Sequence, residues 1–127
     1  MIILDQIEQG TEEWLRARAG KFTSSEFKTV CTNTGKRSSG DTAKNYLYQI
    51  AVERETGYPV MSEAKSRSMR RGTELEPEAA DYYRVVYAPS GVEVLNVGLC
   101  VSDDGLYSCS PDLLMPSVRG GVEIKCP

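Results

Sequence analysis

The alternation of apolar and polar positions predicts mainly helices in the first part of the chain. A short strand over residues 2–5 leads to Thr11, an N-cap residue followed by acidic first-turn side chains, and Gly20 ends the helix that starts there. Thr23 and Glu26 have the spacing of a capping box, which predicts a second helix ending near residue 31.

The middle of the chain predicts a longer helix after a polar loop. Residues 32–41 are polar and rich in turn formers, and residues 42–56 show helical periodicity that stops at Gly57. The predicted apolar face of this helix consists of Tyr46, Leu47, Ile50 and Ala51.

A further capping box at Thr73 and Glu76 predicts another helix, ending near Tyr87. Pro77 is compatible with its first turn, where amides have no intrahelical partner. The expected buried stripe is Leu75, Ala79, Tyr82 and Val86.

After residue 89 the pattern changes to strands joined by Asp-Asp-Gly and Arg-Gly-Gly turns. The expected strands span residues 92–101, 106–110 and 121–125 and form an antiparallel meander. The sequence therefore predicts an α+β protein, with N-terminal helices packed on a small, mostly antiparallel sheet within one domain over residues 1–127.

Composition describes an ordinary globular chain. It is 40% apolar and 26% charged with a net charge of −3, which argues against binding nucleic acid through bulk charge. No apolar run approaches the ~20 residues of a membrane span. The N-terminus lacks a basic segment and a cleavage site, so a cytoplasmic setting is expected.

The chain has four cysteines and no histidine. The cysteines are widely spaced without a CxxC pair, so they are read as small buried hydrophobic residues rather than zinc ligands. The missing histidine excludes Ser-His-Asp and Cys-His nucleophile schemes. Chemistry must come from carboxylates, lysine, hydroxyls or a metal. The cysteines are Cys31, Cys100, Cys109 and Cys126.

The candidate chemistry lies near the end of the chain, in Asp112 and in the Glu123-Ile124-Lys125 segment. Alternate residues of a strand share a face, so Glu123 and Lys125 are expected to point the same way. Two carboxylates and an ammonium can hold Mg²⁺ beside a phosphodiester and activate water. The alternative is an ordinary ion pair on a wet strand.

Other polar residues are ambiguous by themselves. Glu76 is more simply explained as the capping-box partner of Thr73 than as a metal ligand. Arg18, Ser25 and Ser110 could hold a phosphate, Ser25 from the first turn of its predicted helix, but each is also an ordinary surface residue. Trp14 is interpreted as a core anchor. Two basic clusters are read as solvated faces: Arg16, Arg18 and Lys21, and Lys65, Arg67, Arg70 and Arg71.

Five ordered segments resemble the lambda-phage exonuclease family of phage recombination nucleases, within the restriction-endonuclease-like superfamily. They are Gln9–Arg18, Thr23–Glu26, Gly72–Ala80, Cys109–Asp112 and Glu123–Pro127. The resemblance covers essentially the whole chain. Five blocks in order are much more specific than Asp followed by Glu-x-Lys.

The resemblance implies an α/β core of restriction-endonuclease type. It also implies an exonuclease that digests the 5′-ended strand of duplex DNA with Mg²⁺ as its metal and Mn²⁺ as an alternative metal. Asp112, Glu123 and the carbonyl of Ile124 would bind metal, Glu76 would complete a second metal site, and Lys125 would orient or deprotonate the attacking water. Arg18, Ser25 and Ser110 would form the pocket for the 5′-phosphate.

The same resemblance implies partners: DNA with a 5′-phosphate end, a phage single-strand annealing protein, and further copies of the chain in a ring-shaped trimer, in a bacterial host cytosol and away from membranes. Family members continue well past the Glu-x-Lys-Cys-Pro block, so the chain is expected to correspond to the N-terminal part of such an enzyme. Leu113 replaces the usual glycine after Ser-Pro-Asp.

Two alternatives follow. The chain could be an inactive or DNA-end-binding fragment of such a nuclease. It could also resemble the nuclease of CRISPR spacer acquisition, which holds an iron–sulfur cluster through late cysteines, but no cysteine follows Cys126.

Overall fold

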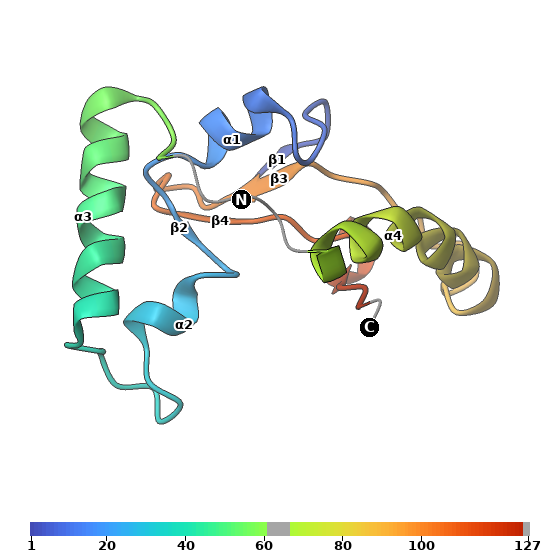
Figure 1. The fold of residues 1–127 in the computed structure, drawn as a ribbon. Coiled ribbons are helices and arrows are strands. Elements are labelled where there is room, and N and C mark those ends of the chain that lie inside the picture. Colours follow the sequence, from blue (N-terminus) through green and yellow to red (C-terminus); the bar gives the residue numbers. More distant parts are fainter. Residues whose placement is uncertain (61–66, 126–127) are drawn as a thin grey trace. The chain divides into compact units, whose positions relative to one another are not determined.

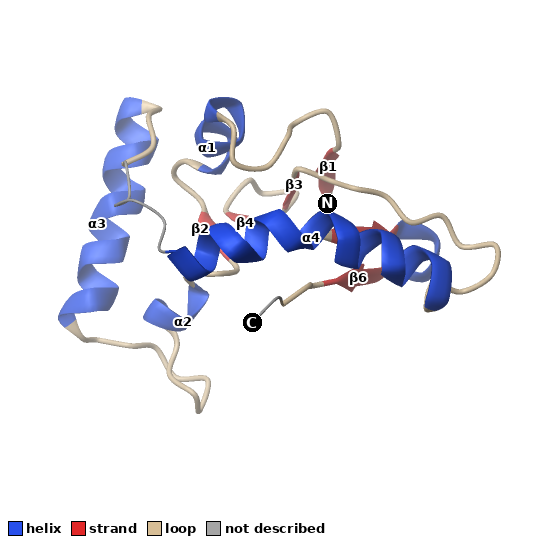
Figure 2. Cartoon of the chain, turned by 45° about the vertical axis from the view of Figure 1, so that its right-hand side comes forward, coloured by secondary structure: helices blue, strands red, loops and turns tan. Residues whose placement is uncertain are grey.

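The computed structural model describes the chain except for residues 61–66 and 126–127, and within helix α4 it describes side chains only from Glu74 onward. The described residues form helices and short strands in two units (Figures 1 and 2). One unit comprises Met1–Met61 with Gly98–Ser110, and the other Ser62–Val97 with Pro111–Pro127. The predicted α+β class is confirmed, whereas the assignment of residues 1–127 to one domain stays a prediction.

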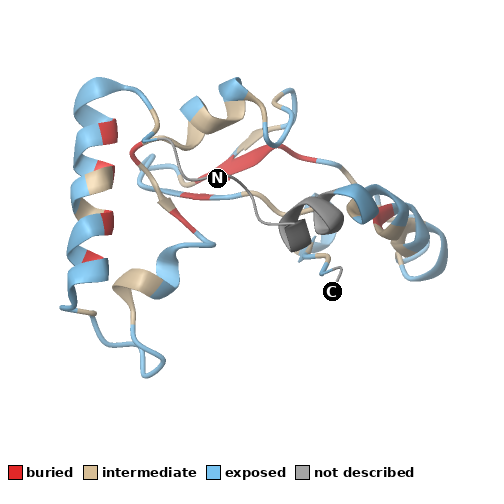
Figure 3. Ribbon diagram, viewed as in Figure 1, coloured by how far each residue is buried: buried red, intermediate tan, exposed pale blue. Residues whose placement is uncertain are grey.

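The first unit is organised around a sheet with the strand order β1-β3-β4-β2. β1 and β4 each pair antiparallel with β3, while β2 pairs parallel with β4. All three residues of β3 are buried, which makes this strand the centre of the unit's core (Figure 3). The elements are β1 (Ile2–Leu4), α1 (Glu12–Arg18), β2 (Phe22–Thr23), α2 (Phe27–Val30), α3 (Asp41–Thr56), β3 (Leu99–Val101) and β4 (Tyr107–Cys109).

Helix α1 forms where the sequence places it. The Thr11 hydroxyl accepts a hydrogen bond from the Trp14 amide at 3.3 Å, and two acidic residues occupy the first turn. Gly20 follows the helix with φ of +72°, a conformation that other residues adopt at a cost. Local signals therefore suffice for this helix.

Helix α3 buries one face against the rest of its unit, and Gly57 closes it in the left-handed conformation. Tyr46 and Ile50 are buried as predicted, but Ala51 is exposed and the inclusion of Ala51 in the buried face is wrong. Glu53 is buried instead. Its carboxylate accepts hydrogen bonds from the amides of Gly20 and Val60 at 2.8 and 2.9 Å, which offsets the cost of burying a charge.

The Tyr46 hydroxyl accepts a hydrogen bond from the buried Thr23 amide at 3.0 Å. Tyr46→Phe removes this acceptor, and the unpaired amide should cost about 1–3 kcal/mol of unfolding free energy. Urea unfolding followed by circular dichroism measures the change. Tyr48→Phe is the matched control because Tyr48 is 69% exposed on the same helix. Equal stabilities for the two variants would contradict this role of Tyr46.

The second unit contains the long helix α4 (Arg67–Val86) and a two-stranded antiparallel sheet. In this sheet β5 (Leu113–Met115) pairs with β6 (Gly120–Val122) across a short 3-10 helix, η1 (Pro116–Val118). All three β5 residues are buried, and an isolated bridge joins Leu95 to Leu114.

Two predicted helix starts are wrong. Thr23 lies in β2, where it pairs with Ser108, so it caps no helix, and α2 begins only at Phe27. Ser25 consequently lies in the turn before α2 and not in a first helical turn. α4 already begins at Arg67, so Thr73 is not its N-cap and Pro77 lies inside the helix. Long-range strand pairing outweighs the local capping pattern at Thr23.

The predicted stripe on α4 and the predicted meander are also wrong. Among the described side chains of α4, Ala80 is buried, whereas Tyr82 and Val86 are 60% and 50% exposed. The strand expected over residues 92–101 is reduced to β3, and β4 and β6 belong to different sheets. The unpredicted strand β5 lies between the strands expected over residues 106–110 and 121–125.

Candidate active site

The register of β5 and β6 brings the predicted acidic residues together. Leu113 is the register partner of Val122, so Asp112, immediately before β5, reaches the segment immediately after β6. The Asp112 amide donates to the Val122 carbonyl at 3.1 Å, and the Asp112 carboxylate accepts a hydrogen bond from the Ile124 amide. A carboxylate is thereby fixed at the shared end of the two strands.

Glu123 and Lys125 meet at the same end, where the Lys125 ammonium forms an ion pair with the Glu123 carboxylate. The predicted reason for their proximity is wrong, however, because β6 ends at Val122 and both residues follow it. Both side chains are exposed, so they lie on an accessible surface and not on a buried strand. Asp112, Glu123 and Lys125 are called the acid–lysine cluster below.

Burial and charge act on this cluster together. Desolvation, and then the neighbouring Glu123 charge, raise the pKa of Asp112, against the lowering effects of the Ile124 hydrogen bond and of Lys125. The hydrogen bond with Glu123 raises the pKa of Lys125, and the charges of Asp112 and Glu76 act in the same direction. The acidic groups thus share one positive neighbour.

Glu76 lies on the half-buried side of α4, four residues before the buried Ala80. Residues four apart occupy the same helix face. Because α4 begins at Arg67, Glu76 is not the capping-box partner that its spacing suggested. Its assignment to a second metal site stays a prediction. The Glu76 charge contributes to the raised pKa of Lys125, which agrees with a position near the acid–lysine cluster.

The donor set of the cluster fits Mg²⁺. In the described part of the chain, no three acidic or cysteine side chains converge into a metal-holding group. Mg²⁺ is usually held by one or two carboxylates plus substrate phosphates and water, not by an all-protein cage. Asp112, Glu123 and the Ile124 carbonyl provide oxygen donors of this kind, and one Asp112 oxygen takes no part in the Ile124 hydrogen bond.

The three residues predicted to bind phosphate form a second cluster in the first unit, and Trp14 connects them. The Trp14 indole N–H donates to the Ser110 hydroxyl at 3.0 Å and to the Gly98 carbonyl at 2.9 Å. The Arg18 guanidinium carbon lies 4.0 Å from the Trp14 ring centroid, and Arg18 Nη2 lies 3.5 Å from the Ser25 hydroxyl. Arg18, Ser25 and Ser110 with Trp14 form the Trp14 cluster.

The guanidinium in this cluster is partly withdrawn from water. Burial lowers the pKa of Arg18, while the nearby Tyr46, Glu26 and Glu53 groups counteract this effect. An arginine remains charged in proteins even so. A half-buried cation that is stacked on an indole ring and lies beside the Ser25 hydroxyl is suited to bind an anion such as phosphate.

Trp14 is the residue that sequence reasoning underestimated. Beyond the core position that the sequence predicts for it, Trp14 contacts both Arg18 and Ser110. The available signal was spacing, since residues 14 and 18 are one helical turn apart on α1. Its contact with Ser110 across 96 positions had no local signal.

Of the two basic clusters predicted to be solvated faces, the structure describes the side chains of only the first. Arg16 pairs with Glu12 at 2.7 Å and lies 5.5 Å from the Tyr58 ring centroid, as expected of a surface arginine. Lys65 lies outside the described residues, as do the side chains of Arg67, Arg70 and Arg71. Cys126 and Pro127 are also outside them.

Each cluster belongs to one unit. The Trp14 cluster lies in the first and the acid–lysine cluster in the second, and only Pro111 separates Ser110 from Asp112 in the sequence. Among the helices that the structure describes, none combines the length and the apolar composition of a membrane-spanning segment.

Comparisons with known proteins converge on one family. The model of the YqaJ-like viral recombinase domain matches residues 13–127. Among solved structures, the crystal structure of LHK-Exo in complex with dAMP is similar, with a TM-score of 0.66 and 36% sequence identity. The match covers 92% of this chain and 54% of the LHK-Exo chain, so the chain spans about half the length of that relative. No curated protein sequence matches significantly.

Proposed function

We propose a nuclease function because the chain belongs to the family of YqaJ-like viral recombinase domains. The resemblance to phage recombination exonucleases agrees with this membership and with the similarity to LHK-Exo. In its finer form, the proposal is a Mg²⁺-dependent exonuclease that degrades the 5′-ended strand of duplex DNA. One observation carries it: the β5–β6 register brings Asp112, Glu123 and Lys125 to one exposed strand end.

The acid–lysine cluster would perform the hydrolysis. Asp112, Glu123 and the Ile124 carbonyl would hold Mg²⁺, which supplies charge neutralisation at the scissile phosphate and activation of water. The Lys125 ammonium, held in position by its ion pair with Glu123, would orient the attacking water. It could take a proton from that water only after giving up its own, as the neutral amine. Glu76, whose charge acts on Lys125, would hold a second metal ion.

The Trp14 cluster would select the DNA end. Arg18 provides charge-assisted hydrogen bonds to a terminal 5′-phosphate, and the Ser25 and Ser110 hydroxyls provide further donors. Binding of the terminal phosphate would restrict the reaction to strand ends, because a bound substrate is positioned at a lower entropic cost. dAMP, which LHK-Exo binds, is a mononucleotide of the class that an exonuclease releases from DNA.

Digestion of a short duplex tests the proposal. Substrates with 5′-phosphate or 5′-hydroxyl ends are incubated with the chain in Mg²⁺, in Mn²⁺ or in a chelator, and the released mononucleotides are counted. We expect release that requires the metal and favours the 5′-phosphate. Metal-independent release, or release only from 3′ ends, would contradict the mechanism.

Trp14→Phe tests the end-selecting role of the Trp14 cluster. Phenylalanine retains a ring beside Arg18 but lacks the N–H that holds Ser110. The preference for 5′-phosphate over 5′-hydroxyl DNA should fall by roughly 2- to 10-fold, as for a lost hydrogen bond. The ratio of the two rates is the measurement, because it does not depend on the folded fraction. An unchanged ratio would separate Trp14 from phosphate recognition.

A second candidate function is binding of DNA ends without cleavage. The Trp14 cluster favours it, because an arginine stacked on a ring beside a serine hydroxyl suits binding of a terminal phosphate whether or not the strand is cut. Retention of a labelled 5′-phosphate duplex with no nucleotide release in Mg²⁺ would identify this function. A ring-shaped trimer, an annealing-protein partner and a location in the host cytosol remain predictions from the resemblance.

A further inference from the structure

Strands β3 and β4 place two cysteines directly opposite each other. Cys100 and Cys109 are register partners in this antiparallel pair, so their side chains share one face of the sheet. Opposite residues in such a pair have Cα atoms about 4.5–5.5 Å apart, within the roughly 4.4–6.8 Å that a disulfide spans. Both cysteines are free thiols.

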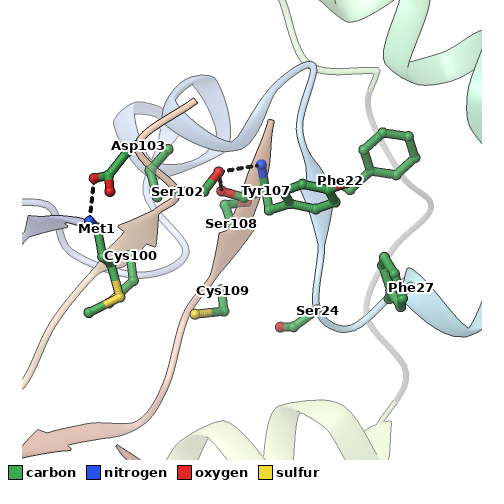
Figure 4. A pocket seen from close by; sticks show the side chains of 11 residues that line it. Met1, Phe22, Ser24, Phe27, Cys100, Ser102, Asp103, Tyr107, Ser108 and Cys109 are labelled. Carbon is green, nitrogen blue, oxygen red and sulfur yellow. Dashed lines mark hydrogen bonds and ion pairs between the residues drawn. The ribbon is translucent and has the colours of Figure 1, made fainter. Parts of the chain in front are cut away.

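A pocket of about 610 Å³ in the first unit gives access to this pair. Both cysteines line the pocket and are labelled in Figure 4. Cys109 is exposed, whereas Cys100 is buried. The expectation that the cysteines are buried is therefore wrong for Cys109. The other lining residues are mainly apolar and include Met1, Phe22, Phe27 and Tyr107.

We propose that Cys100 and Cys109 form a thiol–disulfide site that reacts with a low-molecular-weight disulfide such as oxidised glutathione. The thiolate of Cys109 attacks one glutathione sulfur, forming a mixed disulfide and releasing one glutathione thiolate. Cys100 then loses its proton to water, and its thiolate attacks the Cys109 sulfur. This step forms the Cys100–Cys109 bond and releases the second glutathione. Two protein thiols are oxidised and one glutathione disulfide is reduced.

The environments of the two thiols suit this order. Burial raises the pKa of Cys100, and the neighbouring Cys109, including a hydrogen bond between the two thiols, acts in the same direction. Cys100 therefore stays protonated while the accessible Cys109 reacts first. Once the mixed disulfide exists, Cys100 is its nearest thiol because the strand pairing holds the two residues opposite each other.

The product is a covalent link across the β3–β4 hairpin. A reducing cytosol keeps such a pair as thiols, and oxidising conditions close it. The link would end one residue before Ser110 of the Trp14 cluster. The site does not depend on the nuclease proposal, because its chemistry uses neither cluster.

Bond mapping after oxidation tests the site. The full chain carrying Cys31→Ser and Cys126→Ser, which leaves Cys100 and Cys109 as its two remaining cysteines, is treated with oxidised glutathione and analysed by mass spectrometry. We expect a monomer that has lost two hydrogens and yields a linked Cys100–Cys109 peptide, and dithiothreitol should reverse the change. Addition of Cys100→Ser should instead leave glutathione on Cys109.

Two results would overturn the proposal. One is a stable glutathione adduct on Cys109 while Cys100 remains open to alkylation. The other is cross-linked dimers in place of the internal bond. The same mapping on the unmodified chain guards against folding defects of the substituted background, and absence of the Cys100–Cys109 peptide there also counts against the site.

Discussion

Replacement of Lys125 by alanine should reduce Mg²⁺-dependent digestion of 5′-phosphorylated duplex DNA by roughly 10²–10⁴-fold, the usual contribution of a positioned acid–base group. The Lys125 side chain is 81% exposed and its ion pair is with Glu123, so its removal should leave the fold intact. The initial rate of nucleotide release measures the loss. Circular dichroism verifies that the variant is folded.

Lys44→Ala is the matched control for this change. Lys44 is also an exposed lysine, paired with Asp41 at 3.6 Å on α3 in the other unit. The Lys44→Ala variant should digest DNA at the rate of the unmodified chain. Equal activity of the Lys125 and Lys44 variants would remove Lys125 from the chemistry.

Asp112→Asn should abolish metal-dependent cleavage, with a loss on the order of 10³-fold that corresponds to several kcal/mol of metal-derived stabilisation. Asparagine retains an oxygen that can accept the Ile124 hydrogen bond, so the β5–β6 end should keep its shape. What disappears is the negative charge that would hold Mg²⁺. Calorimetric titration with Mg²⁺ or Mn²⁺ should show weaker binding in parallel with the lost activity.

Glu93→Gln serves as the control for Asp112→Asn. It removes a carboxylate charge from an exposed position of the same unit, and Glu93 belongs to neither β5 nor β6. Metal binding and digestion should remain unchanged in this variant. A normal metal affinity for Asp112→Asn would show that Asp112 is not a ligand.

Local signals predicted only part of the fold. Thr11 and Gly20 bound α1 as expected, and α3 ends at Gly57, because capping and glycine chemistry act over a few residues. Thr23 has the same local chemistry as Thr11 but lies in a strand, since its pairing with Ser108 and its hydrogen bond to Tyr46 come from distant residues. Single-sequence patterns do not contain such contacts.

In the candidate site, too, local patterns predicted which residues take part, whereas long-range contacts determine how they meet. Asp112, Glu123 and Lys125 meet as predicted, although through the Leu113–Val122 register and not through alternation along one strand. The sequence pattern could not reveal this register because it predicted no strand over residues 113–115, where β5 lies. Likewise, Arg18 and Ser110 lie far apart in sequence and share Trp14 only after folding.

The most direct measurement follows both strands of a single duplex during digestion. One end carries a 5′-phosphate, each strand carries its own label, and products are resolved over time in Mg²⁺ and in a chelator. The proposed mechanism predicts stepwise loss of the 5′-phosphorylated strand to mononucleotides in Mg²⁺, an intact partner strand, and no loss in the chelator. Persistence of both strands in Mg²⁺, or equal loss with the chelator, would contradict it.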